Sequence, residues 1–333
     1  MNRRDALAAL FALCTATRGT RSFAQARLPQ KPVRIGMLPD PVEPGHRLFI
    51  DAMRERGWST PRDFVELKSG LDFGVQIEQA ARRIVEQTPD VIFTVNTAYA
   101  LAAHRLTATV PIVMWTSGYP VEAGLARSLA RPGKNVTGNS LYAGIDIWGK
   151  LLELLREASP GIKRVGVLWD YTQPFHPQEE VAPLLDRMQH AASALRIAAN
   201  VVQVRHPDQL PGALAEIDAK RPQAMLITTG PPLFTRQAEV MEFAVARRLP
   251  TITDFRWRSE IVPYPLFVYA PSTLDLVVRA VGYVDRILRG AAPGELPIQQ
   301  PAKFQLVVNL TTARRIGLTL PRSILLRSDQ MVE

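Results

Sequence analysis

The sequence has a single cysteine, Cys14, and it lies close to the amino terminus. Without a second thiol the chain forms no internal disulfide, and the body of the chain has no thiolate metal site and no cysteine nucleophile. Stability must come from an ordinary hydrophobic core. With 47% apolar and 21% charged residues, the composition is sufficient to build one.

Long apolar runs and the common catalytic motifs are also missing. No apolar run approaches the roughly 18 residues that a membrane-spanning helix needs. The chain has no Walker A, G-x-G-x-x-G or G-x-S-x-G segment, and its five histidines lack the spacing of a metal site. We therefore expect a protein that does not span the membrane, has no cofactor or metal, and is not an enzyme.

The chain is basic, with a net charge of +9 and an isoelectric point near 10.0. Such a charge raises nucleic acid or an acidic membrane as partners. The basic residues occur singly or in pairs, however, and no run of five exists. This pattern favours solvated helix faces, and we expect no nucleic-acid partner.

The amino terminus has the features of a secretory signal. Arg3 and Arg4 precede an apolar segment at 6–16, and residues 24–26 have an A-x-A cleavage pattern. We predict a signal peptide over residues 1–26 and a mature protein in the periplasm. The residues after the arginine pair match the twin-arginine consensus poorly, so the Sec route is favoured.

The rest of the chain alternates between strand-like and helix-like patterns. The stretch 110–142 shows both: a buried apolar strand at 110–115 is followed by a turn at Ser117 and Gly118 and a helical pattern at 121–131. Strands alternating with helices at this spacing predict an α/β fold with a parallel, doubly wound sheet.

An internal repeat suggests that this pattern occurs twice. Residues 164–170 (RVGVLWD) repeat 34–40 (RIGMLPD), and two further strand segments repeat in the same order: 222–230 matches 89–97, and 249–252 matches 110–113. The alternative is that buried parallel strands simply look alike. We expect two similar lobes joined by a multi-strand hinge.

The lobes have expected boundaries. Lobe 1 comprises residues 27–139 plus about 264–300, and lobe 2 comprises 140–263 plus about 301–333. The helical pattern at 274–288 and the strand-like segment at 304–308 are too few to form a third domain, so they complete the two lobes.

Two segments carry a family resemblance: S-L-A-R-P-G-x-N-V-T-G at 128–138 and L-P-x-Q-Q-P-x-K-F at 296–304. With them, the chain resembles the bacterial ABC-transporter substrate-binding proteins that include tryptophan- and tyrosine-binding members. The resemblance implies a type I periplasmic binding protein that closes on a small molecule and delivers it to the transmembrane subunits of an ABC permease. We expect it to act as a monomer.

Two departures from the family bear on the ligand. Members of the family usually carry Asp where Tyr119 and Gly230 stand in this sequence. An amino acid needs a carboxylate near its ammonium group, because a buried cation without a partner is costly. A standard amino acid is therefore in doubt, and an aromatic or carboxylate-bearing small molecule is favoured.

Ligand-binding residues are expected at the carboxyl ends of strands, where open α/β sheets bind their ligands. Thr97 is expected to cap a helix, to bind an anion with the free amides after it, or both. The aromatic candidates would sandwich a flat ligand, or simply pack. The expected residues are Pro39, Asp40, Asn96, Thr97, Ala98, Ser117, Tyr119, Asp170, Tyr171, Phe175, Thr229, Gly230, Trp257, Glu260 and Tyr269.

Two other functions stay open. An exported α/β enzyme would use Asp40, Asp170 or Glu260 as acid or base, and two carboxylates with mutually shifted pKa values in one cleft would favour it. A periplasmic ligand sensor would keep the fold but contact a membrane receptor in place of a permease.

Overall fold

The computed structural model describes residues 31–41, 45–71, 76–141, 147–170, 178–228, 233, 236–254, 264–301 and 303–333. Lys31–Glu333 form one compact unit, distinct from Met1–Gln30. The predicted signal peptide lies outside the described residues. Among the helices that are described, none has the length and apolar character to cross a bilayer.

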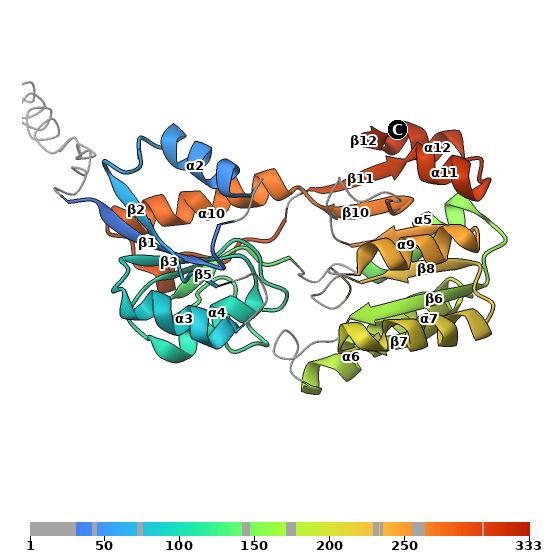
Figure 1. Cartoon of the computed structure of the whole chain (residues 1–333), viewed down its shortest axis with the longest axis horizontal. Helices are drawn as coiled ribbons and strands as arrows, with labels where there is room; N and C mark the ends of the chain where they lie inside the picture. The colour runs from blue at the N-terminus through green and yellow to red at the C-terminus, as the bar shows by residue number, and fades with distance from the viewer. Residues whose placement is uncertain are drawn as a thin grey trace, which may run out of the picture. The chain divides into compact units, whose positions relative to one another are not determined.

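The first lobe is built on a five-stranded parallel sheet in the order β2-β1-β3-β4-β5. Helices α2 and α10 cover one face of this sheet, and α3 and α4 cover the other (Figure 1). The strands are β1 (Val33–Leu38), β2 (Phe64–Leu67), β3 (Val91–Thr94), β4 (Ile112–Met114) and β5 (Val136–Gly138). The helices are α2 (Gly45–Glu55), α3 (Ile77–Glu86), α4 (Thr97–Leu106) and α10 (Thr273–Leu288).

The second lobe has a seven-stranded sheet in the order β12-β11-β10-β9-β8-β6-β7, in which only β10 and β11 are antiparallel neighbours. The strands are β6 (Arg164–Asp170), β7 (Ala198–Val204), β8 (Ala224–Ile227), β9 (Thr251–Thr253), β10 (Phe267–Pro271), β11 (Phe304–Asn309) and β12 (Gln330–Val332).

Helices α5 and α6 pack on one face of the second sheet, and α7 and α9 pack on the other. Two short helices, α11 and α12, follow β11. The bounds are α5 (Ile147–Ala158), α6 (Gln178–Ala194), α7 (Leu210–Ala219), α9 (Gln237–Ala246), α11 (Leu310–Ile316) and α12 (Arg322–Arg327), with 3₁₀ turns η1 (Pro207–Gln209) and η2 (Pro293–Glu295).

The strands are apolar because both faces of each sheet are covered. In β1, Ile35 and Met37 belong to the core under α2 and α10, whereas Leu38 belongs to the core under α3 and α4. Side chains alternate between the two faces of a strand, so each strand supplies residues to both cores.

The predicted repeat is visible in the topology. The order β2-β1-β3-β4-β5 of the first sheet returns in the second sheet as β7-β6-β8-β9-β10. The predicted fold class, two similar α/β lobes with doubly wound, largely parallel sheets, is confirmed.

One expected boundary differs. We expected the chain from about residue 264 to lie in the first lobe, but β10 is part of the second sheet, where Phe267 and Val268 pair with β9. The chain crosses to the first lobe only after Pro271, at the start of α10. The apolar run at 266–269 is compatible with a strand in either sheet. Its pairing with β9 and β11 places it in the second sheet.

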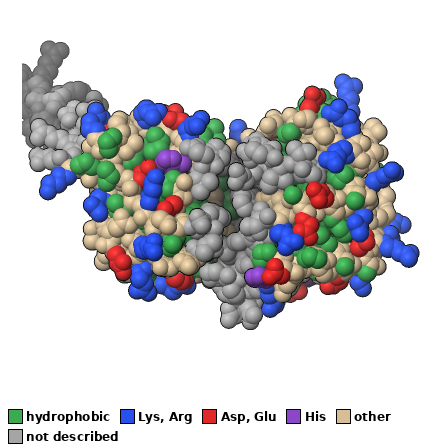
Figure 2. All heavy atoms as spheres, in the orientation of Figure 1, with side chains coloured by type: hydrophobic (Ala, Val, Ile, Leu, Met, Phe, Trp, Pro, Cys, Tyr) green, Lys and Arg blue, Asp and Glu red, His purple; other side chains and the backbone are tan. Residues whose placement is uncertain are grey.

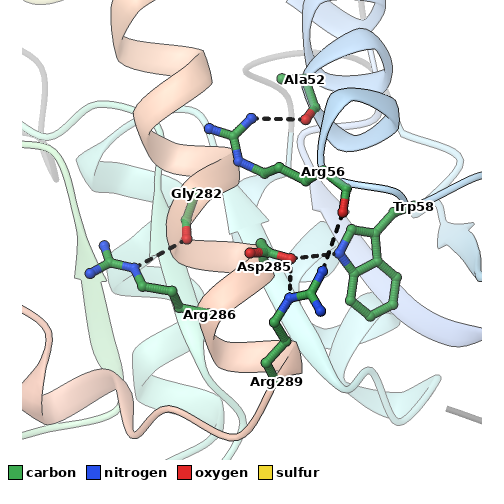
Figure 3. A network of polar contacts seen from close by, with 7 residues as sticks. All are labelled: Ala52, Arg56, Trp58, Gly282, Asp285, Arg286 and Arg289. Carbon is green, nitrogen blue, oxygen red and sulfur yellow. Dashed lines mark hydrogen bonds and ion pairs between the residues drawn. The ribbon is translucent and has the colours of Figure 1, made fainter. Parts of the chain in front are cut away.

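Helix α10 completes the first lobe and is held to α2 by a polar network (Figure 3). Asp285 accepts hydrogen bonds from Trp58 Nε1 and Arg289 Nε, both at 2.7 Å. Arg289 also donates to the carbonyl of Arg56, whose guanidinium reaches the carbonyl of Val278 in α10. Trp58 and Asp285 are 227 residues apart in the sequence, so the network joins distant segments of the chain.

Candidate functional site

In the first lobe, the strands β3 and β4 end beside each other, and their following turns form the centre of the candidate site. Asn96 is the N-cap of α4, and its side chain accepts a hydrogen bond from the amide of Tyr99 at 3.2 Å. We expected Thr97 in that role, but Thr97 is the first helical residue. Asn96 fits the cap because its backbone is extended and its side-chain oxygen reaches back to the helix.

Thr97 links the two turns. Its hydroxyl lies 3.0 Å from the hydroxyl of Ser117 and accepts a 3.0 Å hydrogen bond from the amide of Gly118. Both hydroxyl side chains are buried. The amides of Thr97 and Ala98 come before the first hydrogen bond within the helix, so they are free to donate at the carboxyl edge of the sheet, where a helix N-terminus favours an anion.

Asp40 holds a loop of the first lobe. Its Oδ1 accepts from the amide and hydroxyl of Ser69, at 2.5 and 2.8 Å, and its Oδ2 accepts from the amide of Gly70 at 2.7 Å. The preceding residue, Pro39, follows a cis peptide bond after β1. Because both oxygens of Asp40 already accept hydrogen bonds, this carboxylate is committed to the loop after β2.

The two described tyrosines of the expected site have different settings. Tyr119 is half-buried and lines a cavity of about 310 Å³ together with Ser140 and Arg127. Tyr269 stacks on Phe304, with ring centroids 5.3 Å apart and an interplanar angle of 21°. Burial raises the pKa of the Tyr269 hydroxyl, and the charge of Asp329 raises it further. Tyr269 therefore packs within the second lobe.

The remaining expected residues belong to the second lobe. The backbone of Asp170 pairs with Val204 at the end of β6. The side chain of Asp170 and six expected residues lie outside the described part of the chain: Tyr171, Phe175, Thr229, Gly230, Trp257 and Glu260.

The structure adds residues that the sequence patterns did not indicate. Among the described residues, the buried polar atoms without a hydrogen-bond partner include Trp115 Nε1, Asn139 Oδ1, Trp169 Nε1 and both amide atoms of Gln237. Three of these residues lie at the carboxyl ends of β4, β5 and β6, and the fourth begins α9. Buried polar groups are rarely left unsatisfied, so such atoms at a sheet edge indicate a place for a bound molecule.

One such atom lies elsewhere: Asn200 Nδ2 is in β7, away from the carboxyl ends. A second polar group at the carboxyl edge of the second sheet is Asp254, which directly follows β9 and is 5% exposed. It is a described carboxylate that would face a ligand held at this edge.

A weak sequence signal for Gln237 exists in retrospect. Gln237, Val240, Met241 and Ala244 are all buried and follow the i, i+3, i+4, i+7 spacing of a helix face. A glutamine on an apolar stripe indicates a buried amide. Trp169 packs against Trp148 with ring centroids 5.1 Å apart, so its ring is held while its indole N–H lacks a partner.

The described residues hold no group of three or more His, Cys, Asp or Glu side chains that would bind a metal ion. The expected acid–base alternatives include Asp40, which is tied to Ser69 and Gly70. The arrangement offers hydrogen-bonding groups and aromatic surface, the features of a binding site for a small molecule.

Comparison with known proteins agrees with the predicted resemblance. A family model described as ABC transporter substrate binding protein matches residues 46–332. The curated tyrosine-binding protein of Clostridioides difficile (strain R20291) is 32% identical over 126 residues, which are 38% of this chain and 36% of that protein. The chain thus matches little more than a third of that relative's length.

Solved structures agree in fold. A conserved domain protein from Vibrio cholerae has a TM-score of 0.77 at 22% identity, and the match covers 91% of this chain and 100% of that one. A protein from Streptococcus pneumonia in complex with L-Trp has a TM-score of 0.77 at 19% identity, with the same coverage of 91% and 100%. The family model covers most of the chain, so the resemblance is confirmed: this chain belongs to the ABC transporter substrate-binding protein family.

Proposed function

We propose that the chain is the exported solute-binding component of an ABC importer, which closes its two lobes on a small organic ligand and delivers it to a membrane permease. The observation that carries this proposal is the set of unsatisfied buried polar atoms at Trp115, Asn139, Trp169 and Gln237. They belong to both lobes and lie at strand ends or at the start of a helix. A ligand held between these edges would satisfy them.

The ligand that these groups favour is an aromatic molecule with a carboxylate. The indole N–H groups of Trp115 and Trp169 are donors for oxygen atoms, and aromatic ligands pack favourably beside such rings. The amides of Thr97 and Ala98 suit an anion. The curated relative is named for tyrosine, and one structural neighbour contains L-Trp, both of them aromatic carboxylates.

Whether the ligand also carries an ammonium group depends on the available carboxylates. Family members usually carry Asp at the positions of Tyr119 and Gly230, and Asp40 is tied to its own loop. Asp254 is one described carboxylate at the edge of the second sheet where an ammonium group would be held. The binding of aromatic amino acids should therefore depend on the Asp254 carboxylate, whereas the binding of aromatic acids without an ammonium group should not.

The signal-peptide pattern at residues 1–26 supports export to the periplasm through the Sec route. There the protein would act as a monomer, because one pair of lobes forms a complete site in this fold. A sensor that contacts a membrane receptor would use the same ligand site.

The test is a thermal-shift screen followed by calorimetry. The panel holds aromatic acids, aromatic amino acids, aromatic amines and aliphatic acids. A ligand present at a hundredfold excess over its Kd stabilises the folded state by about 2.7 kcal/mol, which raises the Tm. We expect aromatic acids or aromatic amino acids to bind, and the amines and aliphatic acids to have no effect.

The variant Asp254→Asn distinguishes aromatic amino acids from aromatic acids that lack an ammonium group. If the ligand is an amino acid, this variant loses affinity, whereas an aromatic acid without an ammonium group binds as well or better. Each hit is recovered and analysed by chromatography. Conversion of the hit into a product would refute a pure binding protein and support the enzyme, and a panel that binds only aliphatic acids would refute the proposed ligand class.

A further inference from the structure

The amino-terminal edge of the second sheet gathers basic side chains that are dispersed in the sequence. In a parallel α/β lobe, strands begin at the edge where the preceding helices end. The register shows this directly, because Arg164 pairs with Ala198 at the start of β7, and Val165 pairs with Ala224 at the start of β8. Residues at helix ends far apart in the chain therefore lie along one edge.

Helices α11 and α12 belong to the same edge. The hydroxyl of Thr312 in α11 donates to the carbonyl of Tyr264, just before β10, at 2.7 Å. Ser323 and Arg327 of α12 both bond to Glu157 in the last turn of α5. The two short helices thus bring their arginines to the place where α5 ends.

We call the following set of exposed residues the basic edge. Figure 2 shows Lys and Arg side chains along the right-hand end of this lobe, where Figure 1 draws the start of β6. The basic edge comprises Arg156, Lys163, Arg164, Arg196, Lys220, Arg221, Arg247, Arg248, Arg314, Arg315, Arg322 and Arg327.

Three acidic residues lie at this edge: Glu157, Asp218 and Glu333, which follows β12 where Val332 pairs with Asn309. Glu157 bonds to Arg327, and Asp218 accepts two hydrogen bonds from Arg247 at 2.7 and 2.8 Å. These two pairs use two of the twelve basic residues and leave the edge strongly positive.

Three arginines of the basic edge occupy a backbone conformation that favours glycine. Arg196, Arg221 and Arg248 have φ values of 55°, 49° and 55°. Each is the left-handed residue that ends a helix: the amide of Arg196 bonds to Ser193, and that of Arg248 bonds to Val245. Glycine is the usual residue at this position, because any side chain is strained there.

The first lobe ends its helices differently. The corresponding left-handed residues after α2, α3 and α10 are Gly57, Thr88 and Gly290, none of which is charged. The two lobes share one topology, so the arginines are not required by the fold. The three positive charges at these positions are therefore a feature of the second lobe alone.

We propose that the basic edge binds the surface of an anionic phospholipid bilayer. Twelve dispersed cations suit a field of anionic headgroups. Leu326 is 73% exposed and lies in α12 between Arg322 and Arg327, an apolar side chain among cations of the kind that enters the headgroup region. Phe243 lies beside the basic edge, but the guanidinium of Arg247 covers its ring at 3.9 Å from the centroid, so the ring is not open for a nucleic-acid base to stack on.

This contact goes beyond ligand binding and does not depend on the ligand. A protein that serves a membrane-embedded transporter gains from a weak, reversible hold on the membrane, because the search for the transporter becomes two-dimensional. The contact uses the edge opposite the carboxyl ends of the second sheet's parallel strands, so it leaves the candidate ligand residues uncovered.

The test is co-sedimentation with vesicles of phosphatidylcholine alone or with about one third phosphatidylglycerol. The full chain and Lys31–Glu333 are both used, since the apolar amino-terminal segment has membrane affinity of its own. The triple variant Arg196→Gly, Arg221→Gly, Arg248→Gly removes three charges and relieves the backbone. We expect Lys31–Glu333 with the wild-type arginines to bind only the anionic vesicles, and the same segment with the triple variant to lose about a hundredfold in partitioning.

Two matched variants isolate the edge. Changing the same three arginines to lysine keeps the charge and should keep binding. Lys68→Gln, Arg82→Gln and Arg131→Gln together remove three exposed charges from the first lobe and should also keep binding. Thermal unfolding confirms that every variant is folded.

Three results would overturn the proposal. They are equal sedimentation of Lys31–Glu333 with neutral and anionic vesicles, unchanged binding by the triple glycine variant, and an equal loss in the first-lobe control. Tighter binding to a single-stranded oligonucleotide than to the anionic vesicles would assign the edge to nucleic acid instead.

Discussion

Gly36 and Gly166 lie at equivalent places in the two lobes, each directly beneath an isoleucine of a covering helix. A Cβ atom on Gly36 would lie 2.5 Å from Cγ2 of Ile84, and one on Gly166 would lie 2.6 Å from Cγ2 of Ile217. The Cβ of a proline also lies near the added atom in both cases, Pro89 at 3.4 Å and Pro222 at 3.5 Å. The repeat in the sequence therefore extends to the packing of helix on strand.

This packing gives a first prediction. Gly36→Ala and Gly166→Ala should each lower the free energy of unfolding by about 1–3 kcal/mol, because the branched carbon of the isoleucine is too close to the backbone to move aside. Urea unfolding followed by circular dichroism measures the change. Gly212→Ala is the matched control: it has no neighbour within 4 Å and lies inside α7, so it should raise stability. Equal stability of all three variants would refute the close approach.

A second prediction concerns the turn that Thr97 and Ser117 build. Thr97→Val keeps the shape of the side chain but leaves the amide of Gly118 without its acceptor. We expect a loss of about 1–3 kcal/mol in unfolding free energy, the cost of a buried donor without a partner. Thr97→Ser keeps the hydroxyl and should lose less. Hydrogen exchange of the Gly118 amide reports the bond itself, and unchanged protection in Thr97→Val would contradict the assignment.

Much of the fold follows from the sequence by simple physics. Strands of a doubly wound sheet are apolar on both faces, so segments such as Val91–Thr94 are recognisable without any alignment. The repeat of R-[IV]-G-x-L-x-D places Gly36 and Gly166 in register. The position of β10 was not predictable in this way, because its lobe is decided by pairing with β9 and β11, segments 15 or more residues away.

The candidate site was less predictable. Asn96, Thr97 and Ser117, which we selected because they follow the carboxyl ends of strands, lie together in the structure, and their role toward a ligand stays a prediction. The rule that ligands lie at the carboxyl ends of strands does not predict which hydrogen bonds each side chain makes. Asp40, for example, follows a strand as the rule requires, but its carboxylate is hydrogen-bonded to the loop after β2. Gln237 was missed because a glutamine in a helix is usually a surface residue; only burial shows otherwise.

A third prediction is a pH dependence at the junction of α5 and α12. The hydrogen bond from Ser323 and the contact with Arg327 hold the pKa of the Glu157 carboxyl below its usual value of 4.5. A lowered pKa in the folded state means that the carboxylate stabilises the fold above that usual value. The contribution is then lost as the pH falls through the folded pKa.

Glu157→Gln removes this titration. We expect the Tm difference between wild type and Glu157→Gln to be constant above about pH 5 and to shrink as the pH falls below about 4. Ser323→Ala removes one of the two side chains bonded to the Glu157 carboxylate and should reduce this trend. A difference that stays constant down to pH 3 would show that the two helices are not coupled through this carboxylate.

The last prediction separates stability from binding at Gln237. Gln237 is 1% exposed, and among the described residues both of its polar side-chain atoms lack a hydrogen-bond partner. Gln237→Leu should therefore raise the free energy of unfolding, by about 1–3 kcal/mol, since it replaces an unsatisfied buried amide with an apolar group of similar size. If the amide hydrogen-bonds the ligand, the same change should weaken binding about tenfold, the equivalent of 1.4 kcal/mol. Asn200→Val removes an amide in β7 whose buried nitrogen lacks a partner, away from the carboxyl ends, and should change stability alone. Calorimetry with the ligand found in the screen tests this prediction. A Gln237→Leu variant that is more stable but binds with unchanged affinity would show that Gln237 is only an unfavourable core residue. A gain in stability together with a loss of affinity is the result expected for a binding residue.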